Sequence, residues 1–172
     1  MPTACLLALF VAASGLAAKR SYNETQVIHS SDYLYTKVID GNTILFENLD
    51  HAHIVKLFGV HAPELNQACG SYADCGKDAK KHLDKLLHGV VHCTVVKVVA
   101  KDKTYLGRCT VEEGTHSHNV NKDMIRNGYA NANLVQSEDY EKDMEYARKG
   151  RFGLYDRVTR AKNPSFKQFD EL

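Results

Sequence analysis

Cysteines are the residues whose number and spacing most directly predict chemistry in this chain. There are five, and Cys5 lies in an apolar N-terminal stretch that we expect to be removed. The other four form an even set, which in a secreted chain predicts two disulfides with three possible pairings. A zinc site is the weaker alternative, because such sites use short C-x-x-C pairs that this set lacks. The four are Cys69, Cys75, Cys93 and Cys109.

Two histidine pairs are the next group with possible chemistry. His51 and His53, like His116 and His118, are separated by one residue, which places both imidazoles on one face of an extended strand. Both pairs lie near predicted turns, where histidines are usually solvated, so metal binding is the lesser alternative. The sequence has no Ser/His/Asp or Cys/His arrangement for a nucleophile and no glycine-rich loop for phosphate.

The composition indicates one compact domain with little net charge. The chain has 172 residues, of which 44% are hydrophobic. Its 22 basic residues nearly balance 21 acidic ones, which leaves a formal net charge of +1. That balance excludes a strong overall electrostatic field for attracting nucleic acid, but it does not exclude a local basic cleft.

Both ends of the chain indicate the secretory pathway. Residues 1–18 carry no charged side chain and end in small residues, which predicts a signal peptide rather than a membrane span. Asn23 begins an Asn-Glu-Thr glycosylation sequon. The last residues, Asp170–Leu172, resemble endoplasmic reticulum retention signals, although Phe169 departs from the usual pattern and an ordinary acidic tail is an equal alternative. We therefore expect the endoplasmic reticulum lumen or secretion.

The hydrophobic pattern predicts strands first and helices later. We expect a flexible lead-in over residues 19–32, because this stretch is polar and has no period. The order of elements, without parallel βαβ units, predicts an α+β domain with a small closed barrel and helices around it. The expected strands are 33–39, 43–46, 54–60, 90–99 and 108–112, and the expected helices are 76–88, 119–127 and 138–149.

The helix predicted over residues 76–88 has two distinct faces. Apolar residues recur at helical spacing on one face, and lysines occupy the other. These lysines are candidates for phosphate contacts, but a solvated surface is the more common role for such a face. The lysines are Lys77, Lys80, Lys81 and Lys85.

Five short segments follow one another in an order that resembles the staphylococcal nuclease (thermonuclease-like) family. The resemblance covers roughly residues 33–156 and implies a five-stranded OB-fold β-barrel with three helices. It implies a domain over residues 33–157, followed by a tail over 158–172. The segments are Val38–Thr43, Val55–Glu64, Asp102–Arg108, Asp123–Ala130 and Ala147–Tyr155.

The resemblance also implies which residues would act in phosphodiester hydrolysis. In that family calcium binds two carboxylates and a backbone carbonyl, a glutamate activates water, and two arginines hold the charge on phosphorus. Glu64 falls at the general-base position, Arg108 at one arginine and Lys56 at the other. Leu134 lies near the place of a nucleotide-stacking tyrosine, while Tyr105 keeps an aromatic ring in the hairpin.

The two calcium carboxylates are the positions where this sequence departs from the family. Asn42 and His61 fall there, and Ala62 falls where a backbone carbonyl is used. An amide oxygen is neutral and imidazole nitrogen is a poor calcium ligand, so we expect weak calcium binding or none. Zinc or manganese held by Asn42, His61 and Glu64 is the alternative, because imidazole suits those metals.

The disulfide pairing also follows from the resemblance. In the family register the fourth and fifth strands are antiparallel neighbours, which places Cys93 opposite Cys109. Cys69 and Cys75 bracket a single loop before the first helix. We therefore predict the pairs Cys69–Cys75 and Cys93–Cys109.

Three functions fit these residues. The first is a binding module that uses the family's cleft for nucleic acid or another anionic ligand, without calcium-dependent cleavage. The second is an active nucleic-acid phosphodiesterase, an endonuclease with altered metal use. The third is a lumenal protein whose partner is a polypeptide.

Overall fold

The computed structural model describes residues 26–69, 72–100 and 104–156. The predicted signal peptide, the Asn23 sequon and the predicted C-terminal tail lie outside these ranges. Within them the chain is a mixed α+β domain, and no described helix is long and apolar enough to cross a bilayer. The helices are η1 (Ser30–Asp32), α1 (Cys75–Leu86), α2 (Val120–Arg126) and α3 (Glu141–Gly150).

One mostly antiparallel sheet of seven strands forms the body of the domain. Its strand order is β1-β6-β7-β4-β3-β2, and β8 pairs with β7. The meander of β2, β3 and β4 was predicted, whereas the parallel pairing of β4 with β7 was not. The strands are β1 (Val27–His29), β2 (Tyr35–Asp40), β3 (Thr43–Glu47), β4 (Ala52–Leu57), β6 (Val90–Ala100), β7 (Thr104–Glu113) and β8 (His116–Asn119).

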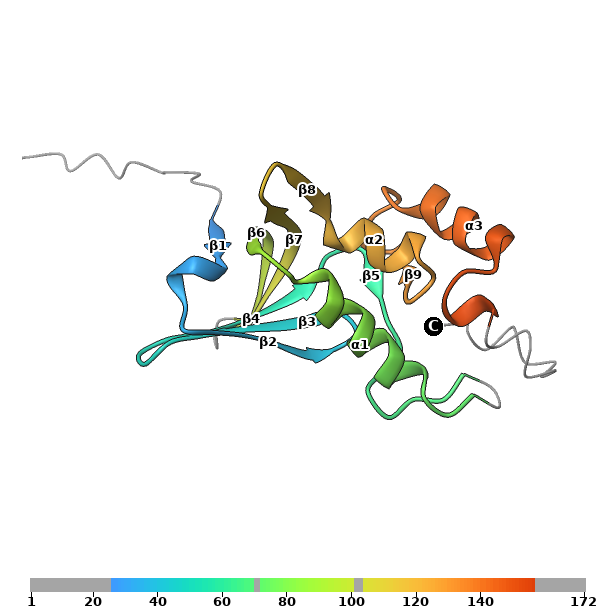
Figure 1. The fold of residues 1–172 in the computed structure, drawn as a ribbon, viewed down its shortest axis with the longest axis horizontal. Helices are drawn as coiled ribbons and strands as arrows, with labels where there is room; N and C mark the ends of the chain where they lie inside the picture. Colours follow the sequence, from blue (N-terminus) through green and yellow to red (C-terminus); the bar gives the residue numbers. More distant parts are fainter. Residues whose placement is uncertain (1–25, 70–71, 101–103, 157–172) are drawn as a thin grey trace, which may run out of the picture.

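The hydrophobic core lies between this sheet and the helices. Alternate residues of the central strands are fully buried, as the period of two requires for strands with one face inward. Helix α1 contributes Ala79 and Leu83, and α2 contributes Met124 and Ile125. Figure 1 shows α2 and α3 beside the short strands at one end of the molecule, with α1 crossing near β2 and β3. The buried strand residues include Ile44, Phe46, Val55, Leu57, Val91 and Val111.

Both disulfides are present with the predicted pairing. Cys93 and Cys109 lie opposite each other in the register of β6 and β7, with Cα atoms 4.1 Å apart. Cys69 and Cys75 join the loop before α1 to the first residue of that helix, with Cα atoms 5.9 Å apart. One disulfide therefore joins two neighbouring strands, and the other closes a short loop.

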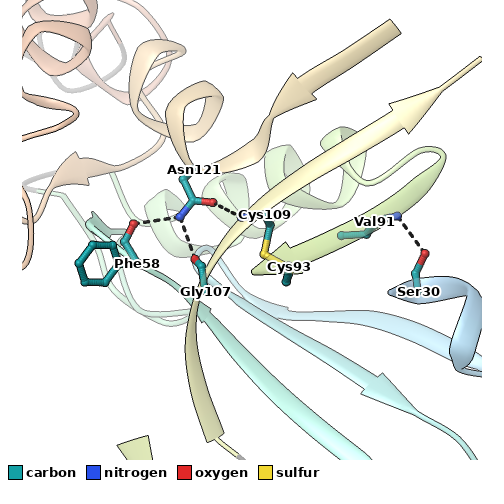
Figure 2. Close-up of a disulfide and its surroundings, with 7 residues drawn as sticks. All are labelled: Ser30, Phe58, Val91, Cys93, Gly107, Cys109 and Asn121. Atoms are coloured by element: carbon teal, nitrogen blue, oxygen red, sulfur yellow. Dashed lines mark hydrogen bonds between the residues drawn. A yellow bond between two sulfur atoms is a disulfide. The ribbon is translucent and has the colours of Figure 1, made fainter. Parts of the chain in front are cut away.

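Residues 26–32, the described part of the expected flexible lead-in over 19–32, contain strand β1 and helix η1. Strand β1 pairs antiparallel with β6, and Ile28 is buried against the core. The backbone N–H of Val91 donates a hydrogen bond of 2.9 Å to Ser30 Oγ in η1 (Figure 2). A strand of three residues is too short to show a hydrophobic period, which is why the sequence carries no signal for β1.

Three further boundaries differ from the prediction. The strand expected over 54–60 is interrupted at Phe58 and Gly59, and the φ of 73° at Gly59 is compatible with glycine but strained for other residues. Beyond it, β5 (Val60–His61) leaves the main sheet and pairs with β9 (Asn131–Ala132). The fifth strand, expected over 108–112, is β7 and begins at Thr104, so residues 104–107 form strand rather than turn. The third helix begins at Glu141 rather than 138.

Candidate functional site

A polar cleft of about 510 Å³ opens where the β2–β3 turn meets the end of β4 and the loop after β5. Five residues predicted for the site line it together: Asn42, Lys56, His61, Ala62 and Glu64. The cleft also contains Asp40, which the family resemblance did not single out. Residues from both sides of the β2–β3 turn and from the chain beyond β4 therefore lie around one hollow.

The β2–β3 turn places its two polar residues at the cleft by a bulge and a tight turn. The register between β2 and β3 shifts between Val38 and Asp40, which inserts Ile39 as an extra residue. The backbone N–H of Asn42 then donates to Asp40 Oδ1 at 2.9 Å, which closes the turn. Gly41 is required between them, because an added Cβ would lie 2.7 Å from the Ala79 Cβ atom.

Both ends of the Asn42 amide are bonded within the protein. Its Nδ2 donates to the carbonyl oxygen of Val60 at 3.3 Å. Its Oδ1 accepts a hydrogen bond of 3.0 Å from Thr43 Oγ1. A carboxylate at this position would face the Val60 carbonyl without a donor, so the local hydrogen bonding fits an amide.

Close packing against α1 fixes the backbone at Glu64. A Cβ atom on Gly76 would lie 1.7 Å from the Glu64 carbonyl oxygen, so only glycine allows this approach. Gln67 donates its backbone N–H to that same oxygen at 2.8 Å and accepts the Glu64 N–H on its Oε1 at 2.9 Å. The backbone is thus held at both polar groups, while the Glu64 side chain is exposed in the cleft.

The two remaining cleft residues differ in charge. His61 is half-buried, and this burial lowers its pKa, with the nearby Glu64 carboxylate acting weakly in the opposite direction. His61 is therefore mainly neutral at pH 7. Lys56 is exposed on β4 and supplies the cationic charge of the cleft lining.

Arg108 does not line this cleft, although the resemblance predicts it beside Glu64. Its Nη2 lies 2.6 Å from Asp139 Oδ2, and its guanidinium lies 4.8 Å from the centre of the Phe58 ring. The ion pair raises the pKa of Arg108, and hydrogen bonds from Ser137 and Arg108 lower the pKa of Asp139. The second predicted cation of the site is thus paired with a carboxylate from the loop before α3.

The buried Asn121 of α2 positions the strand that carries Arg108, and sequence reasoning missed it. Its Oδ1 accepts the N–H of Cys109 at 2.8 Å, and its Nδ2 donates to the carbonyls of Phe58 and Gly107 at 2.9 and 3.0 Å (Figure 2). Gly107 and Cys109 flank Arg108 in the chain, and Phe58 carries the ring under its guanidinium. An asparagine inside a helix gives no sequence signal for these backbone partners.

Other predicted candidates do not join the cleft. Tyr105 is 7% exposed and stacks on His53 with ring centres 5.4 Å apart, so it belongs to the core. Leu134 is exposed. His118 bonds the Leu86 carbonyl through Nε2 at 3.1 Å. Across residues 26–69, 72–100 and 104–156, no three His, Cys, Asp or Glu side chains are close enough to hold a metal ion.

The mixed α+β fold, with its order of helices and strands, agrees with the staphylococcal nuclease fold. Its polar cleft lies where the β2–β3 turn meets the end of β4. The family model described as staphylococcal nuclease homologue matches residues 54–157. The chain therefore belongs to the staphylococcal nuclease family. The match includes Lys56, His61, Glu64 and Arg108 but begins after Asn42. No curated protein matches the chain significantly.

Proposed function

We propose that this domain binds single-stranded nucleic acid at its cleft and does not cleave it by the calcium-dependent mechanism of the family. The observation that carries the proposal is the pair of uncharged side chains, Asn42 and His61, at the positions the resemblance assigns to calcium carboxylates. Lys56 beside them keeps a cation for phosphate. The cleft thus keeps polar groups that can contact a ligand, but it has fewer negatively charged groups to bind a metal ion.

The hydrogen bonds of Asn42 support weak calcium binding. Calcium affinity rises with the number of charged oxygen ligands, and an amide contributes none. The amide is also engaged by Val60 and Thr43 at its two ends. Turning its oxygen toward a cation would break the bond from Nδ2 to the Val60 carbonyl, at a cost of about 1 kcal/mol.

The state of His61 supports the same reading. Burial lowers its pKa, so it is mainly uncharged at pH 7, and its nitrogen is a poor ligand for a hard cation. Asp40 is the carboxylate nearest the turn, but one of its oxygens accepts the N–H of Asn42. The residues present therefore do not fit the calcium site of the family.

The remaining cleft groups suit nucleic acid in a different way. The carboxylates of Asp40 and Glu64 are acceptors, which match the amino groups of exposed bases rather than phosphate. Lys56 provides a cation for the phosphate between them. Single strands expose both kinds of group at once, which is why we infer a single-stranded ligand.

An altered phosphodiesterase is the second candidate, and the exposed Glu64 favours it. This carboxylate lies in the cleft on a fixed backbone, as a general base for water would. That function needs another metal or cation to neutralise the charge on phosphorus. Cleavage assays with several metals separate it from simple binding.

The finer fold and the location are part of the proposal. We propose that the sheet closes as the five-stranded OB-fold barrel of the family, and that the folded unit extends from about residue 26 to 157. The two disulfides support an oxidising compartment. Secretion or retention in the endoplasmic reticulum follows from the predicted signal peptide and the Asp-Glu-Leu end.

Fluorescence anisotropy with a labelled single-stranded oligonucleotide tests the binding proposal. The full mature protein is titrated in excess chelator and then in millimolar calcium. We expect the same Kd in both conditions, and a weaker Kd for Lys56→Gln. Lys122→Gln, which changes an exposed lysine on α2, is the matched control and leaves the Kd unchanged. Absence of binding in both conditions contradicts the proposal.

A further inference from the structure

A second groove, which shares Leu65 with the cleft lining, gathers lysines from two elements. Lys77, Lys80 and Lys81 of α1 line it together with Lys37 of β2. The groove has a volume of about 390 Å³, and Asp84 is the acidic residue in its lining. The proposed function does not use any of these residues.

The hydrophobic core anchors helix α1, which carries three of these lysines. Ala79 and Leu83 are fully buried and anchor α1 against the core. Helical spacing of three and four residues then places the lysines on adjoining turns of the opposite surface, spanning about 6 Å along the axis. Lys80 is half-buried, and Val38 and Leu65 supply the apolar part of the groove lining.

The lysines are only partly neutralised. Lys77 pairs with Asp74 at 2.9 Å. Among the described residues, Lys37, Lys80 and Lys81 have no carboxylate within ion-pair distance. Three such cations in one groove attract an anion more strongly than the near-neutral chain does as a whole.

The groove adjoins the cleft. Leu65 lines both of them, as the residue that follows Glu64. Strand β2 also connects the two, because its Lys37 lines the groove and its Asp40 lines the cleft. A ligand held only at the cleft would not reach the lysines, whereas an extended polymer with repeated negative charges contacts both.

We propose that the α1–β2 lysine groove, formed by Lys37, Lys77, Lys80 and Lys81, binds the phosphate backbone of a single-stranded nucleic acid that continues into the cleft. This inference rests on the proposed nucleic-acid binding and adds where the backbone is held. The cleft lining contains two carboxylates for a single lysine, so most of the electrostatic attraction comes from the groove.

The salt dependence of binding tests this inference. The Kd of a labelled single-stranded oligonucleotide is measured over a range of salt concentrations for the full mature protein. For single strands, each lysine–phosphate interaction contributes about 0.7 to the steepness of log K against log salt. We expect the double variant Lys80→Gln/Lys81→Gln to have a slope that is shallower by about 1.4. Lys97→Gln/Lys142→Gln, with two exposed lysines on β6 and α3, keeps the original slope.

Three other results overturn it, and each is distinguishable. If the wild type binds but the groove variant and the control have equal slopes, the groove proposal fails and cleft binding stands. If the wild type binds no oligonucleotide, both proposals fail. If a heparin oligosaccharide binds through Lys80 and Lys81 while the oligonucleotide does not, the groove serves sulfated glycans instead. Unchanged melting temperatures confirm that the variants fold.

Discussion

Arg108 on β7 and Asp139 in the loop before α3 form an ion pair, with 2.6 Å between Nη2 and Oδ2. The two residues are 31 positions apart. In the family resemblance, Arg108 would face the reacting phosphate. Here the Asp139 carboxylate of the same chain pairs with the guanidinium instead, and the Phe58 ring packs against one face of the guanidinium.

Removing that carboxylate should strengthen nucleic-acid binding. Asp139→Asn removes the charged partner of Arg108, which keeps its contacts with Tyr140 and Phe58, and so makes the guanidinium more available to phosphate. We expect the Kd for a single-stranded oligonucleotide to fall about fivefold, a modest gain because the pair is partly exposed to solvent. Glu138→Gln removes the same charge one residue earlier and is the control. Equal effects of both changes would mean that the pair does not restrain Arg108.

Asn121 should be the main polar contributor to stability near the site. Asn121→Ala leaves the Cys109 N–H and the carbonyls of Phe58 and Gly107 without the partner they now have. We expect the free energy of unfolding to fall by about 3 kcal/mol. Asn66→Ala, at an exposed position, should change it by less than about 0.5 kcal/mol. Urea unfolding of both variants measures the difference, and similar values for the two would refute the positioning role.

Restoring the family's carboxylates should restore calcium binding. Asn42→Asp together with His61→Asp returns two anionic oxygen ligands to the cleft. We expect calcium affinity to rise at least about tenfold over the starting protein by calorimetry. The single variants should show smaller gains. Equal binding before and after the double change would mean that the positions are wrongly aligned with the family.

His82 on α1 should make stability depend on pH. Burial first, and Lys85 second, lower its pKa to about 4, and its Nε2 lies 3.3 Å from Asn127 Nδ2, which suits a neutral ring. The unfolded chain takes up a proton near pH 6.5, whereas the folded chain does so only near pH 4, so stability falls as the pH falls between these values. Urea unfolding should show that the free energy of unfolding falls less between pH 6.5 and pH 4 in His82→Phe than in the wild type. The phenylalanine keeps a ring against Tyr129. If the free energy of unfolding fell equally with pH in the two proteins, His82 would be excluded as the cause.

The sequence predicted well those features that depend on local periodicity. Helix α1 was expected over 76–88 and spans Cys75–Leu86, because its apolar residues repeat at helical spacing. The pairing of Cys93 with Cys109, which the family resemblance implied through its register of two neighbouring strands, was also correct. The family resemblance was confirmed over residues 54–157.

Features that depend on distant partners were not predictable in this way. Strand β1 forms only because β6 is available beside it. The Arg108–Asp139 pair joins a strand to a loop that the sequence places 31 residues later. Asn121 bonds backbone groups, which have no residue identity to recognise in a sequence. The lysine groove likewise needs Lys37 of β2 to lie beside α1.

Cleavage of single-stranded DNA and RNA by the full mature protein tests the central claim most directly. The protein is incubated with each substrate in calcium, manganese or zinc separately, and products are resolved on denaturing gels while anisotropy confirms that substrate is bound. We expect bound but intact strands in calcium. Robust calcium-dependent cutting that Glu64→Gln abolishes would contradict the account, because it would mean that Asn42 and His61 still support the catalytic site of the family.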